Sequence, residues 1–304
     1  MNPIDIADLD CIYLSYDEPE KEEYWVRIKN MVPWARRVDG VLGSDAAHKA
    51  AAQASDTERF ILIDGDNIPD PVFFNQTLNF PTPEYEQAVF RWRARNHVNG
   101  LMYGNGGLSS WTRTHVMNMR THENTDGRDE TVVEFCFDPL YWAMHDCYST
   151  TYPNQSPFHA WRAGFREGVK MTLDRGKRQE IINPKKQFGK RNYQRLLMWC
   201  SVGSDIENGL WSIYGARLGC YMTNCTDWDY VNVRDFKWLN SYWAEHDGQT
   251  TDKMLPFEIM GIGETLKHEL AMSIADPFTV EQSKLFKSLY TNPPRMKNTF
   301  IVGS

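Results

Sequence analysis

Arg59-Phe60-Ile61-Leu62-Ile63-Asp64-Gly65-Asp66 contains the clearest β-strand of the chain, because an unbroken apolar run is followed at once by two acids around a glycine. A short continuous apolar run is typical of a strand that is buried on both faces, as in sheets covered by helices. In open α/β sheets, ligands bind beyond the carboxyl ends of the strands. The two carboxylates are therefore predicted to face a ligand.

Upstream of this strand, the apolar pattern predicts two further strands and two helices. They cover residues 11–15 (strand), 20–30 (helix), 37–42 (strand) and 45–54 (Ala-rich helix), and Ser44 is the expected N-cap of the last helix. Strands and helices that alternate at this spacing form βαβ units. We therefore predict an α/β fold with a Rossmann-type mixed, mainly parallel sheet flanked by helices.

Downstream, residues 88–95 alternate strictly, as in a strand with two different faces. The apolar face carries Phe90, Trp92 and Ala94, and the basic face carries Arg91, Arg93 and Arg95. Gly104-Asn105-Gly106-Gly107 is expected to be a turn. Ser156-Pro157 predicts the start of a helix over residues 158–171.

Beyond residue 171 the character of the sequence changes to helical patterns, at 193–201, 210–218, 264–274 and 279–290, with a Trp-rich stretch among them. This change predicts an α/β domain at 1–171 and a mostly helical, Trp-rich region at 172–304. No apolar run approaches the roughly 20 residues of a membrane helix. The amino terminus lacks the pattern of a signal peptide, and the six cysteines show no paired spacing. We therefore expect reduced thiols, no membrane association and a cytoplasmic location.

The net charge of −7 hides a strongly basic segment. Between residues 175 and 195 the only acid is Glu180, and the eight basic residues are Arg175, Lys177, Arg178, Lys185, Lys186, Lys190, Arg191 and Arg195. The segment thus carries +7, and the rest of the chain carries −14.

The chemistry is predicted from Asp64 and Asp66. Two carboxylates at one strand end, together with phosphate oxygens, suit hard divalent ions, so Mn²⁺ or Mg²⁺ is the expected cofactor. Such an ion neutralises a nucleoside diphosphate as it leaves. An isolated Asp-Gly-Asp is more often a plain turn, and the preceding strand favours the metal site here.

The first third of the chain resembles the nucleotide-binding half of GT-A-fold glycosyltransferases of the family-two-like type. The resemblance rests on Asp17 after the first strand, the Gly43-Ser44 turn, and residues 61–66 with the D-x-D motif. It implies a UDP-type nucleotide-sugar donor, with Asp64 and Asp66 binding the metal and the diphosphate. It also implies that Asp17 or Glu18 contacts the nucleobase, that His48 or Lys49 approaches the phosphates, and that Gly106 and Gly107 face the donor sugar.

More narrowly, residues 14–19, 32–35, 47–51 and 157–162 resemble glycosyltransferase-like proteins of large tailed bacteriophages. This resemblance implies a viral enzyme in the host cytoplasm. Its implied acceptor is a hydroxymethylated pyrimidine, 5-hydroxymethylcytosine, in double-stranded phage DNA.

The DNA contacts are predicted from charge and aromatic rings, because basic residues hold phosphates and rings stack on bases. The basic segment also holds Phe188 and Tyr193, and a flipped base would need an aromatic support such as Trp111 or Trp161. The candidate acceptor contacts are Arg91, Arg93, Lys185, Lys186, Lys190, Arg191 and Trp161. A solvated loop and core packing are the competing interpretations for the basic segment and for the tryptophans.

A transfer that inverts the sugar needs a carboxylate near the acceptor hydroxyl, and Asp138 and Asp146 are the candidate catalytic bases. Three alternatives stay open. The acceptor is a glycan, lipid or protein; the enzyme is a nucleotidyltransferase; or the chain is a nucleic-acid-binding protein without catalysis.

Overall fold

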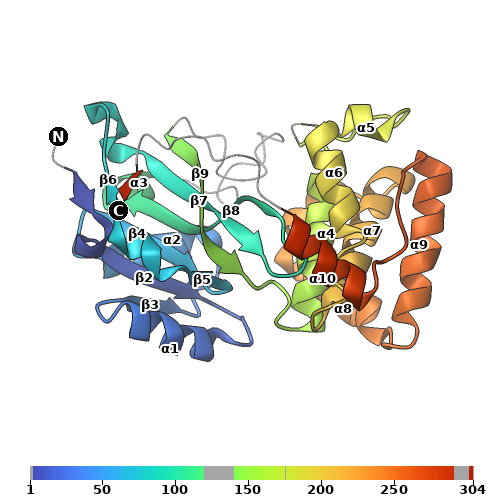
Figure 1. Cartoon of the computed structure of the whole chain (residues 1–304), viewed down its shortest axis with the longest axis horizontal. Helices are drawn as coiled ribbons and strands as arrows, with labels where there is room; N and C mark the ends of the chain where they lie inside the picture. Colours follow the sequence, from blue (N-terminus) through green and yellow to red (C-terminus); the bar gives the residue numbers. More distant parts are fainter. Residues whose placement is uncertain (1–2, 120–139, 175, 291–300, 304) are drawn as a thin grey trace. The chain divides into compact units, whose positions relative to one another are not determined.

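Strand β4 (Arg59–Asp64) lies inside a seven-stranded mixed sheet, which makes the fold mixed α/β (Figure 1). The strand order is β3-β2-β4-β8-β7-β9-β5. The remaining strands are β2 (Asp10–Ser15), β3 (Arg36–Asp39), β5 (Asn67–Pro69), β7 (Val89–Asn96), β8 (Met102–Thr112) and β9 (Tyr141–Thr151). A small antiparallel sheet, in the order β1-β6-β10, combines β1 (Ile4–Asp5), β6 (Gln76–Leu78) and β10 (Ile301–Gly303).

The computed structural model describes residues 3–119, 140–174, 176–290 and 301–303. The chain divides into two units. Unit 1 comprises residues 1–96, 102–152 and 292–304, and unit 2 comprises residues 97–101 and 153–291. The division falls after Tyr152, whereas the change in composition had suggested residue 171, because helix α4 (Pro157–Lys170) packs with the later helices.

The expectation of a mainly parallel sheet is wrong. Strand β2 pairs in parallel with β3 and β4, and β7 pairs in parallel with β9. The pairs β4–β8, β7–β8 and β5–β9 are antiparallel. The predicted Gly104–Gly107 turn also lies within the long strand β8, and this strand follows β7 directly in the sheet. The parallel βαβ pattern thus ends at β4.

The sheet must curl, because only Gly65 and Asp66 separate β4 from β5 although these strands are four positions apart in the sheet. Four spacings of a flat sheet amount to about 19 Å. The three Cα–Cα steps from Asp64 to Asn67 span at most about 11 Å. A direct connection therefore requires the β9–β5 edge to bend back toward the end of β4.

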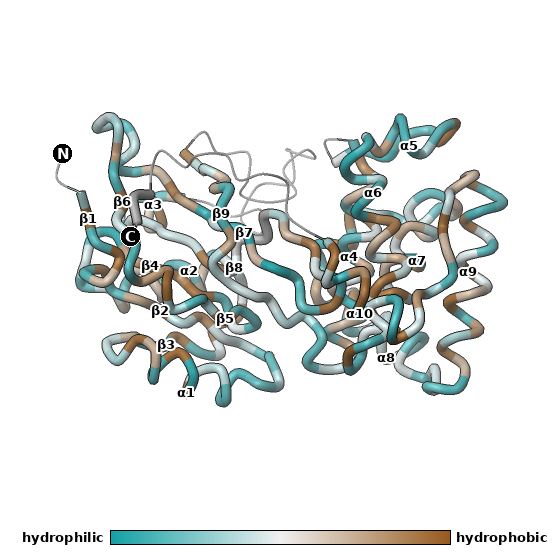
Figure 2. The backbone as a smooth tube through the Cα atoms, in the orientation of Figure 1, coloured by the Kyte–Doolittle hydropathy of each residue, from teal (hydrophilic) through white to brown (hydrophobic). Residues whose placement is uncertain are grey.

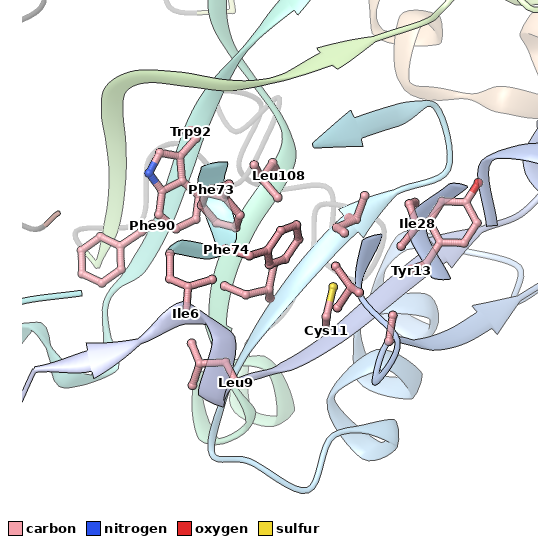
Figure 3. Packing of buried hydrophobic residues seen from close by; sticks show 14 of the residues in the cluster. Ile6, Leu9, Cys11, Tyr13, Ile28, Phe73, Phe74, Phe90, Trp92 and Leu108 are labelled. Atoms are coloured by element: carbon pink, nitrogen blue, oxygen red, sulfur yellow. The ribbon is translucent and has the colours of Figure 1, made fainter. Parts of the chain in front are cut away.

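Helices cover both faces of the sheet in unit 1. They are α1 (Lys21–Met31), α2 (Ser44–Ala54) and α3 (Arg113–Asn118). Alternate residues of β4 face opposite sides: Ile61 and Ile63 belong to one core cluster, and Phe60 and Leu62 belong to the other. The first cluster contains residues of α1 and is shown in Figure 3, and the second contains Ala51 and Ala52 of α2. Helix α2 begins at Ser44 itself, and Gly43 with φ of 91° takes the N-cap position predicted for the serine.

Unit 2 is helical. Its helices are α4 (Pro157–Lys170), α5 (Pro184–Gln187), α6 (Lys190–Trp199), α7 (Gly209–Cys225), α8 (Phe236–Glu245), α9 (Leu255–Leu270) and α10 (Val280–Leu289). Glycines allow α4 and α7 to pack with their backbones in contact: a Cβ at Gly164 would collide with the carbonyl of Ser212, and one at Gly215 with the carbonyl of Trp161.

Candidate functional site

The Asp64-Gly65-Asp66 turn is held from two sides of unit 1. The Tyr13 hydroxyl of β2 donates to the Gly65 carbonyl at 2.9 Å. At the end of β9, the Thr151 hydroxyl donates to Asp66 Oδ2 at 2.9 Å, and the Tyr152 amide donates to the Asp66 carbonyl at 2.8 Å. These bonds hold the turn against both β2 and the end of β9, so its geometry is well defined.

The carboxylates at this turn repel one another. Burial raises the pKa of the Asp64 carboxyl to about 8, the charges of Asp66 and Glu18 add to the rise, and only Arg91 opposes it. Burial also raises the pKa of Glu18, whose carboxylate lies beside Gly65 and accepts a hydrogen bond from the Tyr16 amide at 2.7 Å. A bound cation would relieve this repulsion, because an opposite charge within a few ångströms favours ionised carboxylates.

A divalent cation fits here only if a ligand completes its coordination. Over the described ranges, no group of three or more His, Cys, Asp or Glu side chains is arranged to hold a metal ion. Asp64 and Asp66 would supply two oxygens, and Mg²⁺-type ions commonly take one or two carboxylates with phosphates and water as the remaining ligands. The residues present therefore suit a metal that arrives with a diphosphate.

Asn67, which sequence reasoning missed, lies directly behind the turn. Its side chain is fully buried, and neither its oxygen nor its nitrogen has a hydrogen-bond partner. Gly107 of β8 makes room for it, because a Cβ at this position would overlap the Asn67 amide. This close approach is the structural role of Gly107, while Gly106 lies on the same strand β8.

The residues expected to bind the donor fall into two groups. Asp17 is exposed at the end of β2, and Glu18 faces the acidic turn. On α2, Lys49 forms an ion pair with Asp45 at 2.7 Å, and His48 Nδ1 lies 2.8 Å from the Ser44 carbonyl oxygen. The structure therefore brings Asp17 and Glu18 to the site and pairs Lys49 and His48 within their own helix.

The cation that acts on the acidic turn is Arg91, which lowers the pKa of Asp64 and lies 5.1 Å from the centre of the Tyr141 ring. The sequence had placed Arg91 among the acceptor contacts. On the same strand, Arg93 donates to His145 Nδ1 at 3.2 Å, and Arg95 is exposed. The three arginines on the basic face of β7 thus lie in three different environments.

The structure does not support either candidate catalytic base. Asp138 lies outside the described residues, and Asp146 is buried within β9 with 9% of its surface exposed. A buried side chain on a central strand has little access to an acceptor hydroxyl, so the structure gives no support to Asp146 as the base.

In unit 2, the basic charges and the aromatic rings separate. Lys185, Lys186, Lys190 and Arg191 are exposed on α5 and α6, and Figure 2 shows this segment as largely hydrophilic. Phe188 and Tyr193, by contrast, are buried, as is Trp111 in unit 1. Trp161 is fully buried among aromatic rings. The expectation that Trp161 supports a base is therefore wrong, because its ring fills the core.

Comparison with known proteins adds little to this geometry. No protein-family profile matches the chain, and no curated protein matches it. Among solved structures, HddC from Yersinia pseudotuberculosis is similar at 14% identity and a TM-score of 0.29, over 51% of this chain and 76% of that chain. Similarity at that level carries no argument about function. In the described part of the chain, no helix has the length and apolar character needed to span a membrane.

Proposed function

We propose that this protein is a metal-dependent glycosyltransferase that moves a sugar from a UDP-type nucleotide sugar to a hydroxyl group. The observation that carries the proposal is the cluster of Asp64, Asp66 and Glu18 around a glycine at the carboxyl end of β4, in which burial raises the pKa of Asp64 to about 8. The resemblance to GT-A-fold glycosyltransferases in the first third of the chain supports it.

In this proposal, Asp64 and Asp66 hold Mn²⁺ or Mg²⁺, which stabilises the negative charge of the leaving diphosphate. Tyr13 and Thr151 keep the turn in place through their hydrogen bonds. Arg91 supplies a positive charge that favours the ionised form of Asp64. Asp17, exposed at the end of β2, contacts the nucleobase.

The experiment is a thermal unfolding scan with UDP-glucose and other nucleotide sugars, each with and without Mn²⁺. A ligand that binds only the folded state stabilises it, by about 2.7 kcal/mol at one hundred times its Kd. We expect stabilisation that requires both Mn²⁺ and the nucleotide sugar.

Asp66→Ala should abolish this stabilisation and sugar transfer, and Asp66→Asn tests the charge alone because it keeps an oxygen for the Thr151 hydroxyl. Asp8→Ala, which removes an exposed acid of the same unit, is the matched control. Full activity of the Asp66→Ala enzyme would exclude the proposed metal site.

We further propose 5-hydroxymethylcytosine in double-stranded DNA as the acceptor. Its support is a basic surface on α5, α6 and the segment before them. The surface is defined by the exposed residues Lys177, Arg178, Lys185, Lys186, Lys190 and Arg191. The first turn of α6 contains no acid and begins with Lys190 and Arg191. Cations at the positive end of a helix dipole are unfavourable, and bound phosphates would offset this repulsion.

Neutralising Lys185, Lys186, Lys190 and Arg191 together should weaken DNA binding and flatten its salt dependence, since each lost phosphate contact reduces the slope by about 0.9. The control neutralises three exposed lysines elsewhere in unit 2, Lys237, Lys253 and Lys284. Nucleoside mass analysis after incubation with hydroxymethylated DNA identifies the product.

An unchanged salt dependence of DNA binding in the four-residue variant would contradict the proposal that DNA is the acceptor. If the acceptor is a glycan, lipid or protein, the rate of sugar transfer should depend neither on the salt concentration nor on these substitutions. A nucleotidyltransferase predicts consumption of a nucleoside triphosphate and release of pyrophosphate instead.

A further inference from the structure

A cavity of about 350 Å³ in unit 1 is lined in part by Ile68, Pro69 and Asp70, which follow the acidic turn in the sequence. Its walls come from β5 and the residue after it, from the start of β8, and from the ends of β7 and β9. The volume is within the range of about 300–1,000 Å³ that is usual for small-molecule sites. Because β7 and β9 are parallel, their carboxyl ends meet at one edge of the sheet, and residues from both ends line the cavity.

Two chain segments connect Asp66 to this cavity. Strand β5 starts directly after Asp66 and lines the cavity from Ile68 to Asp70. The second segment is the end of β9, where Thr151 and Tyr152 bond to Asp66. At about 3.3 Å per residue, the lining begins about 7 Å from Asp66 and reaches Asp70 at about 13 Å.

This separation suits a transferred sugar. If the sugar of a diphosphate held at Asp66 extends along β5, it would cover the first half of that distance. An acceptor hydroxyl and a proton-accepting group would then lie in the second half, near Asp70.

Arg95, Ser149 and Asp70 offer polar groups to a ligand in this cavity. Arg95 is exposed and forms no ion pair with any described residue. Ser149 is 6% exposed, and its hydroxyl has no hydrogen-bond partner. Asp70 is the only acid of the lining, and its backbone amide is tied to the Tyr148 carbonyl of β9 at 2.6 Å. One Asp70 oxygen accepts from the Val72 amide at 3.0 Å, which leaves the other oxygen available.

We infer that this cavity binds the acceptor nucleotide, with Arg95 on its phosphate and Asp70 as the base that receives the proton of its hydroxyl group. The inference rests on the proposed glycosyl transfer. The acceptor oxygen forms a bond to the anomeric carbon, and the bond from that carbon to the diphosphate oxygen breaks. The electron pair leaves with the diphosphate, the proton passes to the Asp70 carboxylate, and the configuration of the sugar inverts.

Asp70→Asn tests the base without disturbing the fold, because asparagine also caps the short helix Pro71–Asn75. We expect kcat to fall by about 10²–10⁴-fold, as for loss of a general base. The stabilisation by UDP-glucose and Mn²⁺ should persist, and Asp70→Glu should recover part of the rate. The matched control is Asp229→Asn, since Asp229 caps another short helix in the same way, at 3.1 Å from the Val231 amide, and lines no part of the cavity.

Cys147 provides a direct probe of occupancy, because its half-buried thiol lines the cavity. With Cys136 and Cys225 replaced by serine, a short oligonucleotide containing 5-hydroxymethylcytosine should slow the reaction of Cys147 with N-ethylmaleimide several-fold. Arg95→Ala should remove this protection.

The inference fails if the Asp70→Asn protein keeps the wild-type kcat. It also fails if the oligonucleotide leaves Cys147 unprotected while methyl glucoside, a sugar without a base or a phosphate, protects it. If UDP-glucose and Mn²⁺ do not stabilise the wild-type protein, the proposed function fails instead. The two failures are therefore separable.

Discussion

Asp64→Asn should stabilise the metal-free protein while it removes a ligand of the proposed metal site. The folded protein holds the Asp64 proton with a pKa of about 8, whereas the unfolded chain releases it near 3.8. The stabilising contribution of a raised pKa is complete below pH 3.8 and is lost as the pH rises to 8. At neutral pH, folding of the wild-type protein therefore requires Asp64 to take up a proton that the unfolded chain has released, a cost that asparagine does not have.

The size of the effect follows from the pH interval. Each pH unit between 3.8 and 7 costs about 1.4 kcal/mol, which gives about 4 kcal/mol as an upper limit. Because Asp64 is half-buried rather than sealed from water, we expect about 2 kcal/mol, which corresponds to a rise in Tm of about 4–8 °C for a unit of this size.

The assay is thermal or urea unfolding in EDTA at pH 5, 7 and 9. The advantage of the Asp64→Asn protein should grow from pH 5 to pH 7 and level off above pH 8. Asp56→Asn is the control, because Arg36 lowers the pKa of Asp56 and the substitution should not stabilise. Equal stability of the Asp64→Asn and wild-type proteins at pH 7, or a difference independent of pH, would refute the assigned electrostatics of the turn.

Three further predictions concern unit 2. Gly164→Ala should destabilise it by about 1–3 kcal/mol in urea unfolding, since the new methyl group meets the Ser212 carbonyl, whereas Gly261→Ala, with open space around it, should stabilise α9 by up to about 1 kcal/mol. Arg217→Met should cost about 3–5 kcal/mol by the same measurement, because the buried guanidinium donates to three backbone carbonyls that methionine leaves unsatisfied. Burial raises the pKa of Asp247 to about 6, so its stabilising contribution should be lost as the pH rises from about 4 to 6, and Asp247→Asn should remove this pH dependence of unfolding.

The first third of the fold was predictable because its signals are local. The apolar run before Asp64 is β4, and the upstream pattern corresponds to β2, α1, β3 and α2. The arrangement after Asp66 was not predictable. Strand β5 has only three residues, and it pairs with β9, whose partners are far away in the sequence. A glycine-rich segment that predicts a turn instead lies within β8.

The candidate site shows the same limit. The acidic turn follows from the sequence, because both carboxylates come directly after a strand. Lys49 did not reach the site, since its ion pair with Asp45 four residues earlier competes for its charge. Asn67 and Asp70 carry no motif, and only the return of β5 along β9 brings Asp70 to the cavity. The role of Trp161 could not be predicted from its residue type, because tryptophan is found both in hydrophobic cores and in binding sites.

The two-residue link between β4 and β5 joins the acidic turn to the closure of the sheet. Any opening of the β9–β5 edge pulls on Asp66 itself, because β5 begins at Asn67 and the end of β9 bonds to Asp66. A ligand at the turn should consequently slow amide exchange along β5 and the end of β9.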